Sequence, residues 1–357
     1  MKNQWLRMGG APIALLSLVV LAGFAPPQPT QGSFTVHNLV SDQPGVAVHT
    51  DPNLVNAWGI TASATSPWWV ANNGTATSTL YTGDGTPQSL VVTVPGAPTG
   101  VVFNGGANFI VMNGGASGPA RFIFASEDGT ISGWNPGVPP TVPPPSKEAI
   151  VAVPAAGAIY KGLAIASTAT GDFLYAADFH NGRVDVFDGS FHPVHMAGAF
   201  VDPKLQKHYA PFGIQNLGGK IYVAYARQDK DAEDERAGNG RGFVSVFDTS
   251  GHFLARVASK GELNAPWGMT IAPAGFGPFG GDLLVGNFGD GRINAYDPTT
   301  YEPRGQLMTA DHEPLVIDGL WGIGFGNGAG SGPATTLYFA AGPDEESHGL
   351  FGSVTAN

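Results

Sequence analysis

The sequence predicts an all-β fold, a six-bladed β-propeller built from four-stranded blades. Three observations predict it: a glycine-aliphatic pair that recurs six times, apolar stretches with period-two alternation after each pair, and a composition rich in turn-forming residues. The 357 residues include 52 Gly and 29 Pro, and only 13% are charged, which is typical of many short strands joined by tight turns. One repeated unit of this size favours a propeller over two unrelated sandwiches.

The recurring pair marks the innermost strand of each blade. The pairs are Gly59-Ile60, Gly100-Val101, Gly162-Leu163, Gly213-Ile214, Gly268-Met269 and Gly322-Ile323. The residues before these glycines are Trp58, Thr99, Lys161, Phe212, Trp267 and Trp321. Innermost strands converge on the propeller axis, where a missing Cβ lets neighbouring backbones approach. We therefore interpret the six glycines as packing positions.

Further apolar strands follow each pair. A second strand, such as residues 173–177, leads through a Gly-containing turn into a third, such as residues 183–188 or 243–248. A fourth apolar piece closes most units, at residues 88–94, 148–153, 195–200, 253–258 and 306–308. Four strands per unit is the pattern of a propeller blade.

The two ends of the repeat region complement each other. The last unit ends at its third strand, residues 350–356, while a lone strand, residues 34–40, precedes the first unit. We expect these two strands to pair, so that the N-terminal strand completes the last blade and closes the ring. Closure of this kind removes exposed sheet edges.

The N-terminus has the pattern of a signal peptide. Lys2 and Arg7 precede an apolar run at residues 11–24, which ends at Pro26. The predicted organisation is a signal peptide with a short linker at 1–32 and one propeller domain at 33–357. The run is shorter than the roughly 20 residues that cross a bilayer, so we expect a secreted or periplasmic protein with no membrane span after signal removal.

Charge and cysteine content narrow the partners. There are 28 acidic and 17 basic residues, a formal net charge of −11, and no Cys. An acidic surface repels nucleic acid, and without Cys there is neither a disulfide framework nor a thiolate metal site. We expect a monomer that binds a small molecule, a glycan or a protein at its central face.

Polar residues concentrate in two kinds of loop, those entering an inner strand and those between second and third strands, which emerge on one face of a four-stranded meander. Our candidates for ligand binding on this face are Asn72, Asn73, Glu127, Asp128, Tyr209 and Asp318. Our candidates for binding a metal are Asp178, His180, His208, Asn287, Asp290, His312 and His348. Carboxylates and amides suit Ca²⁺ or Mg²⁺, and histidines suit Zn²⁺.

Turn chemistry is the alternative interpretation of many of these residues. Asn73-Gly74, Asp128-Gly129, Asn181-Gly182 and Asp290-Gly291 are pairs that hairpin turns require. The acidic stretch 229–235 is dense enough for a calcium loop, but Asp234 lies where an EF-hand needs glycine. We interpret that stretch as a solvated loop or a charged lid.

Several segments resemble a known family. They are FASEDGTISGWNP (124–136), AADFHNGRVDVFD (176–188), LLVGNFGDGRINAYD (283–297) and GPDEESHGLFG (342–352). They resemble a family of exported bacterial proteins carried as conserved hypotheticals, related to NHL-repeat and SMP-30/gluconolactonase-like six-bladed propellers. The resemblance implies the fold and export. Lactonase-like members of the wider group hold an axial divalent cation with Glu, Asn and Asp, parts that Glu127, Asn287 and Asp178 would play here.

Two functions from different classes remain open. The first is a binding or scaffold module that uses the central face. The alternative is a metal-dependent hydrolase or lyase, lactonase-like, in which an axial cation polarises a carbonyl and His180 or His348 acts as general base.

Overall fold

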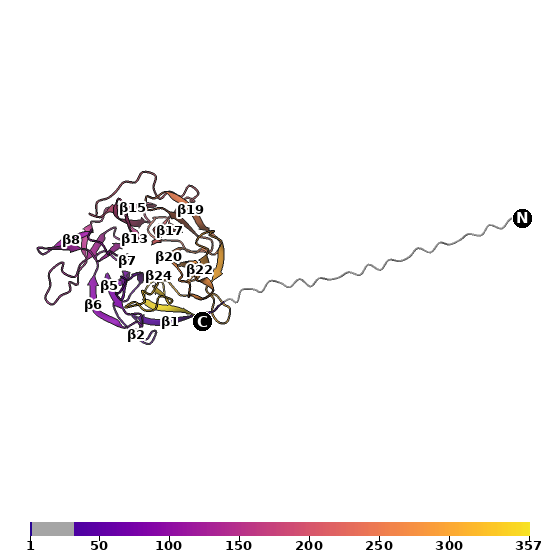
Figure 1. Cartoon of the computed structure of the whole chain (residues 1–357), viewed down its shortest axis with the longest axis horizontal. Helices are drawn as coiled ribbons and strands as arrows, with labels where there is room; N and C mark the ends of the chain where they lie inside the picture. Colours follow the sequence, from indigo (N-terminus) through magenta and orange to yellow (C-terminus); the bar gives the residue numbers. More distant parts are fainter. Residues whose placement is uncertain (2–31) are drawn as a thin grey trace. The chain divides into compact units, whose positions relative to one another are not determined.

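The structure is a computed structural model that describes residue 1 and residues 32–357. The predicted signal peptide falls on residues 2–31, outside the described residues. Within residues 32–357, six small antiparallel sheets are arranged in a ring, as Figure 1 shows. The predicted six-bladed β-propeller is confirmed. Two short 3₁₀ turns, η1 (Asn73–Thr75) and η2 (Gly277–Phe279), are the only helical elements in the described part of the chain.

In blades 1 to 5 the strands run outward from the axis in chain order, whereas blade 6 carries N-terminal strands outside its C-terminal ones, the outermost pair being parallel. Blade 1 contains β3 (Ala57–Thr61), β4 (Trp68–Asn72), β5 (Thr77–Tyr81) and β6 (Pro87–Thr93). Blade 2 contains β7 (Pro98–Phe103), β10 (Phe122–Ser126), β11 (Ile131–Trp134) and β12 (Ile150–Val153), with an inserted hairpin of β8 (Ile110–Asn113) and β9 (Ala116–Pro119). Blade 3 contains β13 (Tyr160–Thr168), β14 (Gly171–Asp178) and β15 (Arg183–Asp188).

The second half of the ring follows the same plan. Blade 4 contains β16 (Tyr209–Leu217), β17 (Lys220–Arg227), β18 (Gly242–Phe247) and β19 (Phe253–Ser259). Blade 5 contains β20 (Pro266–Ile271), β21 (Leu283–Asn287), β22 (Ile293–Tyr296) and β23 (Pro303–Gln306). Blade 6 contains β24 (Leu320–Phe325), β25 (Leu337–Ala341), β26 (Leu350–Ala356), β1 (Phe34–Ser41) and the two-residue β2 (His49–Thr50).

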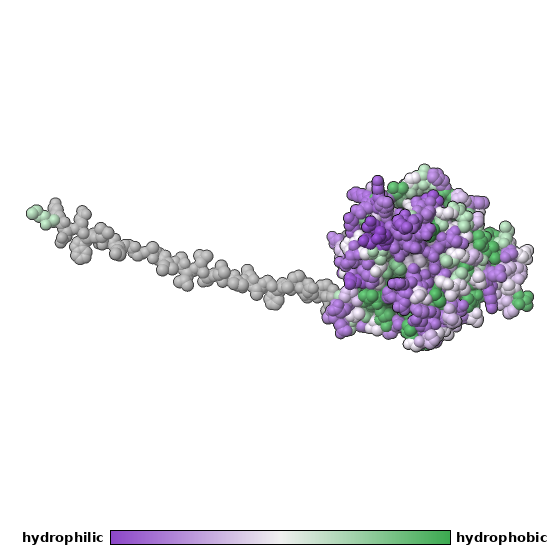
Figure 2. Space-filling model, turned by 180° about the vertical axis from the view of Figure 1, so that it is seen from behind, coloured by the Kyte–Doolittle hydropathy of each residue, from purple (hydrophilic) through white to green (hydrophobic). Residues whose placement is uncertain are grey.

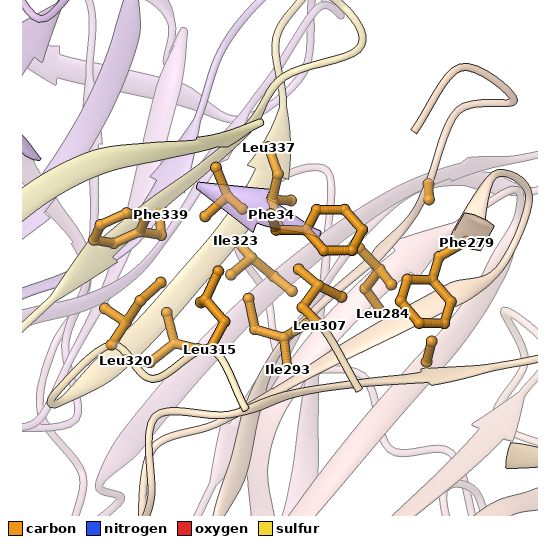
Figure 3. Packing of buried hydrophobic residues seen from close by; sticks show 14 of the residues in the cluster. Phe34, Phe279, Leu284, Ile293, Leu307, Leu315, Leu320, Ile323, Leu337 and Phe339 are labelled. Carbon is orange, nitrogen blue, oxygen red and sulfur yellow. The ribbon is translucent and has the colours of Figure 1, made fainter. Parts of the chain in front are cut away.

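The ring is closed by pairing between the two ends of the propeller. β1 runs antiparallel to β26, from Phe34 opposite Ala356 to Ser41 opposite Leu350. Phe34 also enters the core between blades 5 and 6, where its ring lies 5.0 Å from that of Phe276; Figure 3 shows it among Leu337, Ile323 and Leu284. The predicted closure by the N-terminal strand is therefore confirmed, and apolar burial holds it in place.

The recurring glycines bring neighbouring blades into backbone contact around the axis. A Cβ placed on any of the six would come within 3.0 Å of a backbone atom in the next blade. For Gly59 the nearest atom is Thr99 O, for Gly162 it is Phe212 O, and for Gly322 it is Trp58 O, which returns to the first blade. The packing interpretation of these glycines is therefore supported at every junction of the ring.

Blade 3 departs from the predicted four strands. Residues 195–200, expected as its outer strand, form turns instead, and the blade has three strands. Pro193 lacks the N–H that a continuing ladder needs. Phe200 then adopts a positive φ of 55° and packs between Tyr175 and Phe247. The apolar pattern of this segment serves the boundary between blades 3 and 4 and not a strand.

Within the described residues, no helix is long and apolar enough to cross a membrane. The face drawn in Figure 2 is mostly hydrophilic, with apolar residues in separate small patches.

Candidate functional site

Aromatic rings fill the axial opening at the level of the recurring glycines. Trp58, Phe212, Trp267 and Trp321, which precede four of these glycines, form one buried cluster although they come from blades 1, 4, 5 and 6. Contacts among those four blades are possible only near the axis. The rings of Trp58 and Trp321 are stacked with centroids 3.5 Å apart, and Phe288 stacks on Trp321 at 4.0 Å. These rings form an apolar floor.

Lys161 is the one charged residue among the six that precede the recurring glycines. Its side chain is only 2% exposed, and its Nζ lies 5.3 Å from the centroid of the Trp58 ring. The ammonium donates to Glu127 Oε1 at 2.5 Å and to Asp234 Oδ1 at 3.1 Å. Glu127 lies in the β10–β11 loop and Asp234 in the β17–β18 loop, so this one cation ties blades 2, 3 and 4 together.

Amide side chains extend this network to blades 1 and 6. Asn73 donates its Nδ2 to Glu127 Oε2 at 2.8 Å, and Asn56 donates its Nδ2 to Asn73 Oδ1 at 3.3 Å. Asn56 in turn lies beside Glu346 of the β25–β26 loop. We call the set formed by Asn56, Asn73, Glu127, Lys161, Asp234, Glu235 and Glu346 the axial cluster.

The axial cluster holds more carboxylates than its single ammonium balances. Burial raises the pKa of Glu235 to about 7, against the opposing pull of Lys161. Burial also raises the pKa of Glu346, where Asn56 and Lys161 oppose the rise and Glu127 adds to it. For Lys161, burial lowers the pKa but is outweighed by Glu127, Asp234 and Glu235, so that the net change is upward. A charged Lys161 therefore lies among acids of which two have raised pKa values, that of Glu235 being about 7.

Four buried polar atoms at this place have no hydrogen-bond partner among the described residues. They are Asn56 Oδ1, Trp58 Nε1, Trp321 Nε1 and Glu346 Oε1. A Cβ on Gly342 would clash with Asn56 Oδ1 and would lie 3.4 Å from Trp321 Nε1, so both atoms border the same point. By contrast, Trp68, Trp134 and Trp267 each donate their Nε1 to a backbone carbonyl. Unpartnered buried groups are costly in a finished core.

The six sequence-predicted ligand-binding residues separate into two groups. Asn73 and Glu127 belong to the axial cluster. Asn72 and Asp128 serve their own turns, because Asn72 donates to the hydroxyls of Thr77 and Thr79 and Asp128 accepts from Thr130 N at 2.9 Å. Tyr209 packs edge-on against Phe243, and Asp318 accepts a hydrogen bond from Asp344 N.

The metal candidates are not brought to one point. Buried Asp178 bonds Asn181 and lies 3.4 Å from Arg183, and burial raises its pKa. Asn287 donates to Asp290 and to a backbone carbonyl. No three His, Cys, Asp or Glu side chains of residues 32–357 form a group that would hold a metal ion. Asp178 bonds Asn181 and Glu127 bonds Lys161, whereas the buried Asn287 Oδ1 has no partner among the described residues. The lactonase-like ligand set stays a prediction.

The histidine candidates are also dispersed. His180 Nδ1 lies 3.1 Å from Ala232 O, and His348 Nδ1 lies 2.8 Å from Asp42 Oδ2. His208 and His312 are exposed residues with positive φ. His180 and His348 thus have separate partners on different blades.

Sequence reasoning missed Lys161, Glu235 and Glu346, as well as the two tryptophans with free donors. One signal was present: Lys161 occupies a repeat position that elsewhere holds Trp, Phe or Thr. The acidic stretch 229–235 is also more ordered than a solvated loop, since Asp229 accepts the N–H groups of Asp231 and Glu233. That turn brings Asp234 to Lys161 while 73% of the Asp234 side chain stays exposed. The stretch therefore has the exposure expected of a solvated loop and the position expected of a charged lid.

Comparisons with known proteins agree with the fold. No family model matches the chain. A solved structure described as glucose dehydrogenase aligns with 90% of this chain and 100% of its own, with a TM-score of 0.54 and 13% identity. At that identity the likeness extends to the fold alone. The chain is a six-bladed β-propeller.

Sequence relatives come from Acanthamoeba polyphaga mimivirus. "Uncharacterized protein R648" is 36% identical over 341 residues, covering 90% of this chain and 80% of its own length. "Uncharacterized protein L690" is 34% identical over 352 residues, covering 92% of this chain and 87% of its own. This chain belongs to the same family as these viral proteins. The expected kinship with exported bacterial proteins stays a prediction.

Proposed function

We propose that the protein is a binding module whose axial cluster takes a small organic molecule carrying a protonated amine beside a hydrogen-bond-accepting group. The observation that carries this proposal is the set of unpartnered buried atoms over the tryptophan floor. Asn56 Oδ1 and Glu346 Oε1 accept hydrogen bonds, as an amine requires. Trp58 Nε1 and Trp321 Nε1 donate, as a hydroxyl or carbonyl requires.

Charge supports a cationic ligand. Four carboxyl groups surround one ammonium in the axial cluster, and two of them have raised pKa values. A bound cation would favour the ionised form of Glu235 and Glu346. Lys161 Nζ already lies 5.3 Å from the centroid of the Trp58 ring, an arrangement in which an aromatic ring stabilises a cation.

A matched pair of ligands tests the proposal. Glucosamine and glucose differ by one amine, and both carry hydroxyls for the two indole donors. We expect glucosamine to raise the melting temperature and to quench tryptophan fluorescence saturably at pH 7, where its amine is mostly protonated, with glucose much weaker. Asn56→Leu should abolish the difference, whereas Asn181→Leu in a distant turn should not. Equal responses to both sugars, or none to either, would contradict the proposal.

The alternative of a metal-dependent hydrolase or lyase makes a separate expectation. Its ligands would have to gather from residues that now have other partners, such as Asp178 and Asn287. A thermal-shift scan with Ca²⁺, Mg²⁺, Zn²⁺ and EDTA distinguishes the two functions. A metal-specific shift that Glu127→Gln removes would favour the alternative.

We also propose that the protein is exported. The support is the order of features at the N-terminus, in which Lys2 and Arg7 precede the apolar run at residues 11–24. N-terminal sequencing of protein recovered from the periplasm or medium tests this proposal. Cytoplasmic protein that retains Met1–Arg7 would contradict it.

A further inference from the structure

Blades 3 and 4 are alike in their third strands, β15 and β18, and in the turn that follows each of them. Both blades have the residues Val-Phe-Asp at this place: Asp188 is the last residue of β15, and Asp248 directly follows β18. In blade 3 Asp188 N donates to His192 O at 2.9 Å, and in blade 4 Asp248 N donates to His252 O at 3.0 Å. After this common turn, blade 4 continues into the seven-residue β19, whereas blade 3 makes one bridge, Phe187 to Pro193, and the chain leaves. The outer strand position of blade 3 is therefore largely vacant.

The edge of β15 carries backbone groups that point toward this vacant position. Val186 O accepts a hydrogen bond from Val194 N at 2.8 Å, so even-numbered residues of β15 face outward. Val184 lies two residues earlier and faces the same way, because backbone groups alternate along a strand. Its N–H and C=O have no partner in the described part of the chain. Such an edge is ready to pair with another strand.

A hollow lies beside this edge. It has a volume of 780 Å³, and its walls include Ala152, Val153, Tyr160, Phe187, Phe191 and Met196. The wall comes from the end of β12, from β15 and from the segment that replaces the missing strand. Most of the lining is apolar, and the volume is in the range of known ligand sites.

We propose that the vacant outer-strand position of blade 3 binds an extended peptide segment of a partner protein, which pairs with β15 and places alternate apolar side chains in the hollow. Strand addition gives affinity through main-chain hydrogen bonds and specificity through pockets for every second side chain. The net charge of −11 favours a neutral or basic segment. A strand is the occupant that the same place holds in blade 4.

The probe is a fluorescein-labelled peptide, FLARVAS, which is the sequence of β19 (Phe253–Ser259). We expect its fluorescence anisotropy to rise saturably with the full chain, with a dissociation constant on the order of 100 μM. Two N-methylated versions of the peptide separate strand pairing from simple apolar contact. Methylation at one set of alternate amides should abolish binding, and methylation at the other set should leave it within about twofold.

Variants of the protein complete the test. Val184→Pro removes an outward N–H and leaves the bonds of β15 to β14 in place, so we expect affinity to fall at least about tenfold. Met196→Glu charges the wall and should weaken binding by a similar factor without touching the strand edge. Val201→Ala, at an exposed site outside the hollow, should bind normally. No detectable binding at about 1 mM would overturn the proposal. So would an affinity that stays the same for both N-methylated peptides and for the Val184→Pro and Met196→Glu variants.

Discussion

The axial cluster and the outer turns are built from the same residue types but use them differently. In many turns a polar side chain finds a partner within a few residues, as Asp128 does with Thr130 and Asn181 with Asp178. At the axis, Lys161 reaches Glu127 and Asp234 from other blades, and nearby donors remain free. Local satisfaction indicates turn formation, whereas unsatisfied groups that meet from distant segments indicate a binding site.

The largest expected effect of this difference is on Lys161. Lys161→Met leaves Glu127 beside a buried apolar group, and breaking a buried ion pair from one side costs about 3–5 kcal/mol. We expect the free energy of unfolding in urea to fall by about 3 kcal/mol. Lys230→Met, which removes an ion pair to Asp231 that is 88% exposed on its lysine side, should cost less than about 1 kcal/mol. If the two variants lost the same free energy of unfolding, the buried ion pair of the axial cluster would not differ from an exposed one.

The double variant Lys161→Met with Glu127→Gln sharpens this result. Removing both charges replaces an isolated carboxylate by a neutral amide, so we expect part of the lost stability to return. A double variant that is less stable than the sum of the single losses would contradict the paired arrangement.

The second effect concerns pH. The pKa of Glu235 rises from 4.5 to about 7 in the folded protein, so the native state binds more protons than the unfolded chain between these values. Stability should therefore fall as pH rises from about 4.5 to 7, by about 2–3 kcal/mol. Glu235→Gln should flatten that part of the curve, measured by urea unfolding at several pH values. Glu233→Gln, in the same loop but exposed, is the control and should keep the slope of the natural protein.

Most of the fold could be predicted from the sequence, but little of the axial cluster could. Six glycine-aliphatic pairs predicted six blades because the axis demands the same close approach at every junction. The strands that close the ring were visible as an unpaired start and an incomplete end. Residues 195–200 misled because an apolar pattern does not distinguish a strand from a segment that packs between blades.

The site was harder to predict because its partners are far apart in the chain. Lys161 lies 34 residues from Glu127 and 73 from Asp234, so no local spacing links them. Asn-Gly and Asp-Gly pairs drew attention to turns, and only Asn73 of the Asn73-Gly74 pair also bonds a residue of the axial cluster from another blade. Asn56 and Trp321 stand out because each has a buried polar atom without a hydrogen-bond partner among the described residues. Such a feature depends on three-dimensional packing and cannot be read from the sequence.

A third effect compares two tryptophans on the same floor. Trp267 donates its Nε1 to Lys161 O at 2.7 Å, whereas the Nε1 of Trp58 has no acceptor within residues 32–357. Trp267→Phe should cost about 1–2 kcal/mol beyond the loss of ring area, because it strands a buried carbonyl. Trp58→Phe loses ring area but no hydrogen bond, so thermal unfolding should place it as the milder variant. The order should reverse for glucosamine binding, which Trp58→Phe should weaken and Trp267→Phe should largely spare.

The smallest expected effect is at Asp128, a candidate that the structure places in a turn. Its carboxylate accepts from Thr130 N and from Thr130 Oγ1, and both bonds lie within the β10–β11 hairpin. Asp128→Ala should therefore cost about 0.5–1 kcal/mol in urea unfolding, the worth of a local turn bond. Glucosamine affinity should stay within about twofold of that of the natural protein. Since Glu127 is the adjacent residue, a large loss of affinity in Asp128→Ala would mean that the turn and the axial cluster act as one unit, and the boundary between the two regions would have to be redrawn.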